Sequence, residues 1–420
     1  MLHKRISQIL FLGFLVFPVI IPAGILSMFT ILVLILFLIN PLGNKNNFNF
    51  IKFIWPLFII IFTGFHGFIY HSPYNSLKDI WYITNPIATM LMGYFLMIYI
   101  DNFKSLMKII ILAAVLVAIF HISKFIISPD LLQKSYIEIR SSSAGRGYFI
   151  VVIGLTILIT NWKKFSSENY FTNKYLPISI TIILGLSFIL SFSRTLILVF
   201  ILFFFSLRGV IGKHNKKQKI YLFSLALIII ISFFTDISLN QLTMRYDGTF
   251  VAKLVRSWNE ISISNYSSLD DINMNWRGYE SYRGIQAYQA GNVFNIIAGR
   301  GIGYLTDIGI SIKLGGDQYY RLIPIFHNGY IYLLIKSGLL GLFAYLIFLF
   351  RIFTFANSMD QGNDLEISMS ARICVGLTII ILATTAIMAG FFNKSSLAPV
   401  LLITGACISH LNTHKKINGL

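Results

Sequence analysis

Arginine residues stand beside serine or histidine where three apolar segments are expected to begin. Arg140 and Arg146 occur in "RSSSAGRGYF", and Arg194 follows a serine-flanked turn in "SFSRT". Arg321 and His327 occur in "RLIPIFHNGY". The first turn of a helix presents unpaired N–H groups, serine caps such ends, and guanidinium binds two phosphate oxygens at once. These residues therefore indicate an anion site, with phosphate as the favoured anion.

A second group of candidates lies in the polar segment "NMNWRGYESYRG", which holds Arg277, Glu280 and Arg283. On a helix Arg277 and Glu280 share a face, so an ion pair within the helix is the simplest alternative to a binding role. His327 stands where this polar region meets an apolar segment, and Asn328 follows it. Imidazole can take a proton from a hydroxyl near neutral pH, which suits a general base, although a structural histidine is the simpler interpretation.

Two other motifs predict no cofactor chemistry. "GRGIG" places Gly299, Gly301 and Gly303 in alternation, but it follows no parallel strand, so a tight turn is expected and a dinucleotide site is not. Asp270 and Asp271 form the only adjacent acidic pair in the sequence and are expected in a solvated turn. We therefore expect neither a cofactor nor a metal.

The elements that must position these residues are apolar. Hydrophobic residues make up 56% of the 420-residue chain and charged residues 12%, and the mean hydropathy is +0.74. A soluble protein carries roughly 25% charged residues. The apolar residues fall in blocks of about 17–22, long enough to cross a bilayer as helices. The sequence predicts an all-α polytopic membrane protein with about twelve transmembrane helices, at 6–22, 24–40, 51–70, 81–100, 106–127, 147–161, 176–192, 194–211, 219–236, 326–350, 372–392 and 396–412.

Charge predicts which side each loop faces. With an even number of spans both termini share a side, and a cytoplasmic N-terminus puts more than half of the 34 Lys and Arg residues on inner segments. This bias also explains the net charge of +18 without a nucleic-acid partner. We therefore expect a bundle of about nine spans over 1–236, one large outer loop domain over 237–325, and C-terminal spans over 326–420. Arg194 and His327 would then share the outer face.

Four motifs, taken in order, resemble the bacterial superfamily of O-antigen polymerases and O-antigen ligases. They are "SFSRT" between two spans, "NWRGYE" and "GRGIG" in the long loop, and "HNGYIYLLIKSGLLGLFAYLIF" after it, and the match covers roughly 187–350. The first five spans match only in being hydrophobic. The resemblance implies an all-helical protein of the bacterial inner membrane, with cytoplasmic termini and a periplasmic loop domain, that transfers sugar chains from undecaprenyl diphosphate.

By position, the resemblance implies catalytic roles for Arg194, Arg277 and His327, with Arg283 as an alternative loop arginine. The arginines would stabilise the departing diphosphate without a metal, and His327 would orient or deprotonate the acceptor hydroxyl, giving transfer with inversion. The further residues expected to bind diphosphate or glycan are Arg140, Arg146, Glu280, Arg283, Arg321 and Asn328. The family often has an acid where this chain has Lys336, so no role is assigned to that position.

Three functions remain open. A polymerase adds the growing chain to another lipid-linked repeat unit, and "NWRGYE" favours it, whether the product is O-antigen, capsule or exopolysaccharide. A ligase adds the chain to the lipid A core. A flippase or ion-coupled transporter is the third alternative, but only Lys124 and Lys336 are expected deep in the spans, without acid partners. The expected partners are a lipid-linked oligosaccharide, membrane lipids and a chain-length regulator.

Overall fold

The fold is seen in a computed structural model that describes residues 2–39, 50–133, 139, 148–162, 165, 175–212, 266, 269–313, 319–360, 364–392 and 395–417. The elements before the long loop are α1 (Leu2–Ile20), α2 (Ala23–Ile39), α3 (Ile51–Gly64), α4 (Gly67–Tyr70), α5 (Pro73–Ile100), α6 (Phe103–Ile127), the 3₁₀ helix η2 (Pro129–Gln133), α8 (Phe149–Thr160), α10 (Leu176–Leu190) and α11 (Arg194–Leu207). The later elements are α15 (Leu269–Met274), α16 (Trp276–Gln289), α17 (Val293–Ala298), β1 (Thr306–Lys313), β2 (Tyr319–Ile323), α18 (Gly329–Met359), α19 (Leu365–Met388), η3 (Ser395–Leu397) and α20 (Ala398–Ile417).

The described part of the chain is mostly helical and has the character of a membrane protein. It contains seven helices that are long and apolar enough to cross a membrane. Four shorter apolar helices, α2, α8, α10 and α11, lie where further spans were predicted. The predicted span 219–236 falls outside the described residues. Twelve spans therefore remain a prediction, as does the compartment on either side.

One boundary differs in a way that affects the site. The helix that corresponds to the predicted span 81–100 is α5, and it begins earlier, at Pro73. Pro73 occupies the first turn, directly after the N-cap residue Ser72. Proline suits that position because the backbone N–H of a residue in the first turn has no acceptor within the helix, so nothing is lost when proline lacks it. The earlier start brings Asp79 inside the helix. The predicted start of this span at residue 81 left Asp79 outside the helix and was wrong.

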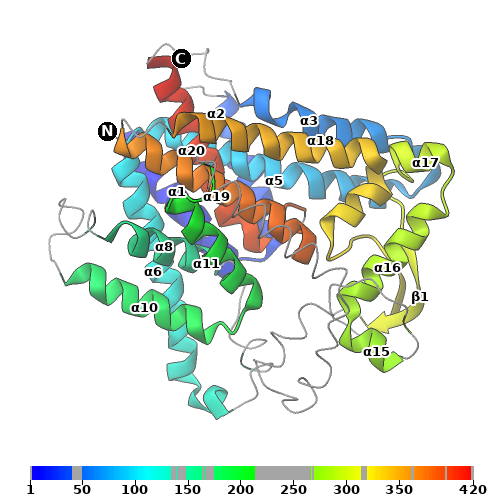
Figure 1. Cartoon of the computed structure of the whole chain (residues 1–420), viewed down its shortest axis with the longest axis horizontal. Coiled ribbons are helices and arrows are strands. Elements are labelled where there is room, and N and C mark those ends of the chain that lie inside the picture. The colour runs from blue at the N-terminus through cyan, green and yellow to red at the C-terminus, as the bar shows by residue number, and fades with distance from the viewer. Residues whose placement is uncertain are drawn as a thin grey trace.

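Helices distant in sequence cross closely at small residues. A Cβ at Gly93 of α5 would overlap the backbone of Leu402 in α20, and a Cβ at Gly405 would overlap the backbone of Met90. Close backbone approach at glycine is typical of packing between helices in membranes, where van der Waals contact replaces the hydrophobic effect. In the same way α18 lies along α3 and α19 (Figure 1).

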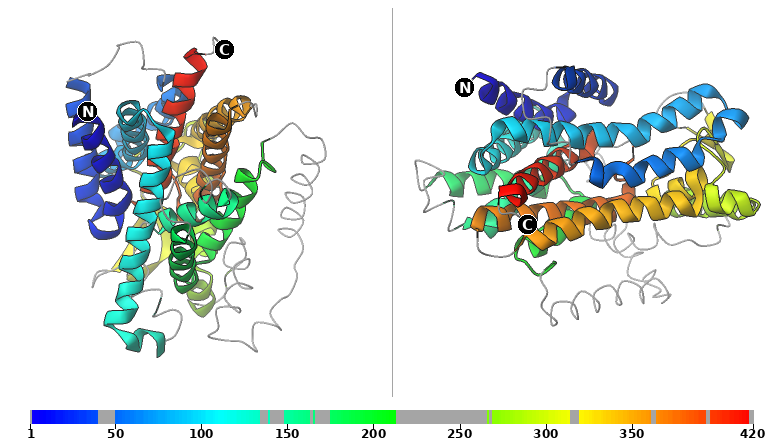
Figure 2. Two further views of the ribbon diagram at one scale, coloured as in Figure 1. Left: turned by 90° about the vertical axis from the view of Figure 1, so that its left-hand side faces the viewer. Right: turned by 90° about the horizontal axis from the view of Figure 1, so that it is seen from above.

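The described residues of the predicted loop domain gather at one end of the bundle (Figure 1). We call the described residues 269–313 and 319–323 the end segment; it contains α15, α16, α17 and the hairpin β1–β2. The two strands are antiparallel, with Thr306 opposite Ile323, so the all-α expectation omitted one small sheet. The chain termini lie toward the other end of the long axis in two views (Figures 1 and 2). The side of the membrane that each end faces stays a prediction.

Candidate functional site

A carboxylate and an imidazole meet where the end segment contacts the start of α18. Glu280, on α16, accepts hydrogen bonds at one oxygen, Oε2, from His327 Nδ1 at 2.7 Å and from the His327 backbone N–H at 3.0 Å. The Glu280 side chain is 6% exposed, whereas that of His327 is 36% exposed. We call this pair the dyad. It joins two residues that sequence analysis selected separately.

The contact determines which imidazole nitrogen can act as a base. An ionised carboxylate only accepts hydrogen bonds, so the proton of a neutral imidazole must lie on Nδ1. Nε2 then carries a lone pair. In catalytic histidines a carboxylate on Nδ1 holds the ring in this tautomer and stabilises the imidazolium that forms on proton uptake. The dyad therefore has the arrangement of an oriented general base.

Close packing holds the dyad in place. Gly284, one turn after Glu280, lies against Ile331, so that a Cβ at Gly284 would meet the Ile331 side chain at 2.5 Å. Asn328 caps α18 by accepting hydrogen bonds from Tyr330 N at 3.0 Å and Ile331 N at 3.4 Å. This cap gives Asn328 a structural role, while its predicted binding role stays a prediction. The His327 carbonyl accepts from Ala389 N–H, just after α19.

Arg194 occupies the first position of α11, as the "SFSRT" motif predicted. Ser193 caps the helix by accepting from Leu196 N at 3.4 Å, and Phe192 before it has a φ of +43°. This tight connection from α10 leaves Arg194 in the turn where the helix dipole is positive. A cation in that turn strengthens the attraction for an anion.

The register of α11 on α19 gives the level of Arg194 in the bundle. Ser206 Oγ donates to Arg372 O at 3.0 Å, and a Cβ at Gly376 would meet the Phe203 ring at 2.6 Å. Residue numbers therefore rise along one helix as they fall along the other, so α11 and α19 are antiparallel. Twelve residues back from Ser206, Arg194 stands about 18 Å further along the bundle.

The dyad lies at the same level. Counting twelve residues on from Arg372, the α19 residue that contacts Ser206, brings α19 to its last turn near Thr385. The start of α18 lies against this turn, because a Cβ at Gly329 would lie 2.8 Å from Thr385 Cγ2. Gly329 and Ala389 are both next to His327 in space. Arg194 and His327 thus flank the end of α19, on the sides that face α11 and α18.

The end-segment arginines differ in their surroundings. Arg277 lies in the first turn of α16, one turn before Glu280, whose carboxylate is directed to His327 rather than into an ion pair within the helix. Arg283 Nη1 donates to Gln286 Oε1 at 2.8 Å, and Nη2 donates to the Asp307 carbonyl at 3.3 Å. The first contact lies within α16 and the second attaches α16 to β1, which gives Arg283 a structural role, while its predicted binding role stays a prediction.

Arg321 is paired across the hairpin. Its Nε and Nη2 donate to Asp307 Oδ1 and Oδ2, each at 2.9 Å. Arg321 and a backbone N–H from Gly309 lower the pKa of Asp307 from 3.8 to about 2. The bidentate partner already neutralises Arg321, which weakens its candidacy as a diphosphate ligand. Arg140 and Arg146 lie outside the described residues.

Sequence analysis missed a second acid–base pair, Asp79 with Lys336. Lys336 Nζ donates to Asp79 Oδ2 at 2.5 Å, and the side chains are 1% and 2% exposed. Tyr332 OH donates to Asp79 Oδ1 at 3.0 Å, and Gly303 N donates to Oδ2 at 2.7 Å. Lys336 also donates to Tyr304 O. The expectation that Lys336 lacks an acid partner was wrong, because the partner lies 257 positions earlier.

The "GRGIG" turn is fitted around this buried pair. Arg300 N donates to Ile335 O at 2.7 Å, and Ile302 N donates to Gly64 O at 2.9 Å. The turn packs where α18 is broken at Gly338, whose φ of 64° favours glycine. The prediction of a tight turn is confirmed, and its function here is to dock the end segment onto the bundle.

No group of three or more His, Cys, Asp or Glu side chains clusters among the described residues in a way that could hold a metal ion. The site contains instead an oriented imidazole, a helix start with an arginine, and a nearby arginine on α16. Together these can accept a proton from a hydroxyl and bind an anion. No known protein family model and no curated protein matches this chain, so a function has to be inferred from the site's geometry and from the motif resemblance.

Proposed function

We propose that this protein is a membrane glycosyltransferase that polymerises a surface polysaccharide from a lipid-diphosphate-linked donor. The observation that carries the proposal is the Glu280–His327 dyad, with Nδ1 held at 2.7 Å and the ring partly open. Such a base needs an acceptor with an ionisable proton, and a sugar hydroxyl is the acceptor that the resemblance to O-antigen polymerases implies.

In the proposed step, the acceptor hydroxyl oxygen attacks the anomeric carbon of the donor sugar. His327 Nε2 takes the hydroxyl proton, and Glu280 stabilises the imidazolium that results. The bond from the anomeric carbon to the diphosphate breaks, and its electron pair leaves on the phosphate oxygen. Attack opposite the leaving group inverts the configuration at the anomeric carbon.

Arg194 and Arg277 are the proposed ligands of the departing diphosphate. Guanidinium retains its charge at any physiological pH and matches two phosphate oxygens. Arg194 adds its charge to the positive end of α11 at the level of the dyad. Fixed charges that face developing negative charge are most effective where little water competes. These residues supply the charge stabilisation for which other transferases use a metal.

The buried pair supports a transferase over a transporter. Both oxygens of Asp79 are bound, by Lys336, Tyr332 and Gly303, and the pair is closed to solvent. A coupling site in a transporter must gain and lose an ion or a proton along an accessible path. A saturated pair that docks the "GRGIG" turn is better explained as a structural lock.

The proposal is tested by Glu280→Gln, which keeps the side-chain size and removes the charge. In a strain that carries the variant in place of the wild type, long-chain polysaccharide should fall by about 10²–10³-fold, since oriented general bases contribute on the order of 10²–10⁴. The protein should still accumulate in the membrane fraction. Glu366→Gln, at the start of α19, is the matched control and should leave the gel ladder unchanged.

Normal chain lengths from Glu280→Gln, with membrane levels equal to the wild type, would contradict the proposal. Deletion of the gene separates the two acceptors. Loss of a polymerase leaves lipid A core with a single repeat unit, and loss of a ligase leaves bare core. A transporter would instead leave its substrate on the cytoplasmic side.

A further inference from the structure

A cavity with a mostly apolar lining, several aromatic rings and a few polar groups lies between α2 and α5, and none of its lining residues is an arginine. Its volume is about 570 Å³, within the range of small-ligand sites. The residues that define its chemistry are Ser27, Tyr74, Lys78, Trp81, Asn85 and Ser395. We call it the α2–α5 cavity.

The walls combine features that suit a phosphorylated sugar. Tyr74 and Trp81 provide ring faces, on which the apolar face of a sugar can pack, and amide and hydroxyl groups can bond its hydroxyls. Lys78 Nζ lies 5.9 Å from the Tyr82 ring centroid, and no carboxylate of a described residue pairs with it. Its neighbour Asp79 is bound to Lys336 instead. Lys78 is therefore the charge in this cavity, and it favours an anion.

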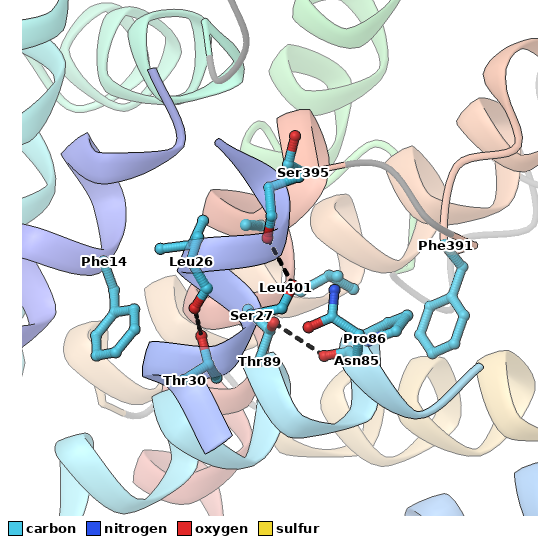
Figure 3. A pocket seen from close by; sticks show the side chains of 12 residues that line it. Phe14, Leu26, Ser27, Thr30, Asn85, Pro86, Thr89, Phe391, Ser395 and Leu401 are labelled. Carbon is cyan, nitrogen blue, oxygen red and sulfur yellow. Dashed lines mark hydrogen bonds between the residues drawn. The ribbon is translucent and has the colours of Figure 1, made fainter. Parts of the chain in front are cut away.

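The floor of the cavity carries an unsatisfied acceptor. Asn85 Oδ1 is buried without a hydrogen-bond partner, which is costly unless a ligand or water supplies a donor. A smaller space of about 20 Å³, close to the size of one water, continues beneath it. Figure 3 shows Asn85, Ser27 and Thr89 around this space, with Ser395 at one side. The two spaces therefore share the polar residues Ser27, Asn85 and Ser395.

Contacts between α5 and α18 connect the α2–α5 cavity to the helix that follows the dyad. Asp79, next to Lys78, contacts Tyr332 in the first half of α18, so α5 adjoins the helix that begins after His327. Ser395 is six residues from Ala389, whose N–H binds the His327 carbonyl, and six residues span at most about 22 Å. α11 packs on α19, α19 packs on α18, and α2 packs on α5, while α5 and α18 meet through the side chains of Asp79, Tyr332 and Lys336.

We propose that the α2–α5 cavity binds the sugar-phosphate head of a second lipid-linked repeat unit, which is the acceptor. This inference rests on the proposed polymerase function, and it assigns the donor to the α11 side and the acceptor to the α2–α5 side of the dyad. A hydroxyl on the acceptor head would then reach His327 while the lipid tail lies along α2 and α5. Two lipid substrates with one base between them explain why the charges occupy separate places.

The experiment is native mass spectrometry of the purified full-length chain, loaded with lipid-linked repeat units extracted from cells that lack the gene. Wild type should bind two copies. Gly24→Trp should bind one, because a Cβ at Gly24 meets nothing within 4 Å and the ring would fill the cavity. Gly185→Trp on α10 is the matched control, since its Cβ is equally unobstructed, and it should bind two.

A second variant guards against a folding defect in the first. Lys78→Gln should weaken binding of the second copy about tenfold, the effect of losing one charged hydrogen bond of about 1.4 kcal/mol. Lys52→Gln, outside the cavity, should not. Glu280→Gln should still bind two copies, which separates binding from catalysis.

Each remaining outcome decides the inference. Two copies on Gly24→Trp, or one copy on wild type, overturn the acceptor site and leave the proposed function standing. No copy on wild type overturns both. Equal displacement of the second copy by phosphatidylglycerol at the same concentration overturns the acceptor site in favour of a phospholipid site.

Discussion

Two acid–base pairs border the first half of α18, and only one of them is open. The dyad lies at the start of α18, with the His327 side chain 36% exposed, and the buried pair lies about two turns further along, just before the break at Gly338, with the Lys336 side chain 1% exposed. Each joins α18 to residues far away in the chain. Both contain a carboxylate that is almost fully buried.

The difference between them lies in how many of their polar atoms remain unoccupied. In the buried pair both Asp79 oxygens have partners, and Lys336 Nζ has two acceptors. In the dyad the Glu280 carboxylate binds one side of the imidazole and leaves Nε2 on the other side. A saturated pair can only hold structure, whereas a pair with one open nitrogen can exchange a proton. Similar chemistry thus serves folding at one place and suits catalysis at the other.

The largest expected effect follows from breaking the buried pair. Asp79→Asn should lower the free energy of unfolding by about 3–5 kcal/mol, because Lys336 would keep a buried charge without a counter-charge. Thermal unfolding of the detergent-purified protein measures it. The double variant Asp79→Leu with Lys336→Met should recover much of this loss, since an apolar pair needs no compensation. A double variant as unstable as the single one would show that shape, not charge, is decisive here.

Breaking the dyad should affect rate and leave stability nearly unchanged. His327→Ala should lower transfer by about 10²–10⁴-fold. The double variant His327→Ala with Glu280→Gln should be at most about threefold slower than His327→Ala alone. The losses in rate are not multiplied, because the two residues act as one unit. Turnover of purified protein in liposomes gives both values, and His3→Ala is the control. Fully multiplicative losses would mean that the two side chains act independently.

A smaller effect is expected where the "GRGIG" turn docks. A Cβ at Gly67 would overlap the Ile302 carbonyl, so Gly67→Ala should cost about 1–3 kcal/mol and loosen the end segment. Limited proteolysis should then cut between Val293 and Lys313 more rapidly than in the wild type. Gly185→Ala, which adds a methyl in open space, should be cut at the wild-type rate. Equal protection in both variants would show that this contact does not hold the segment.

The smallest effect is expected at the exposed Arg321–Asp307 pair. The lowered pKa of Asp307 means that any stabilisation is complete above pH 3.8 and is lost only as pH falls through about 2. Because the side chains are 60% and 44% exposed, solvent screens the pair. Asp307→Asn should leave the melting temperature at pH 7 unchanged within error. A clear drop would show that the hairpin contributes more to folding than its exposure indicates.

Local patterns led sequence analysis to the right residues but not to their partners. His327 and Glu280 were both selected, yet helical spacing suggested Arg277 as the partner of Glu280. The contact with His327 spans 47 positions, and nothing in either segment encodes it. Asp79 lay just before the predicted span 81–100 and was not considered as a partner for Lys336. The signal that could have indicated the buried pair was an acid at the edge of one apolar segment, Asp79, together with a lysine deep in another, Lys336.

By itself the sequence determined that this chain is helical and membrane-embedded, and that polar residues begin several of its helices. Those properties follow from composition and from spacing within one helix, where each residue's environment depends on near neighbours. The tertiary structure alone decided which charge meets which, because a carboxylate and its partner are joined by packing between helices far apart in the chain. That packing closed one acid–base pair and left a nitrogen of the other accessible.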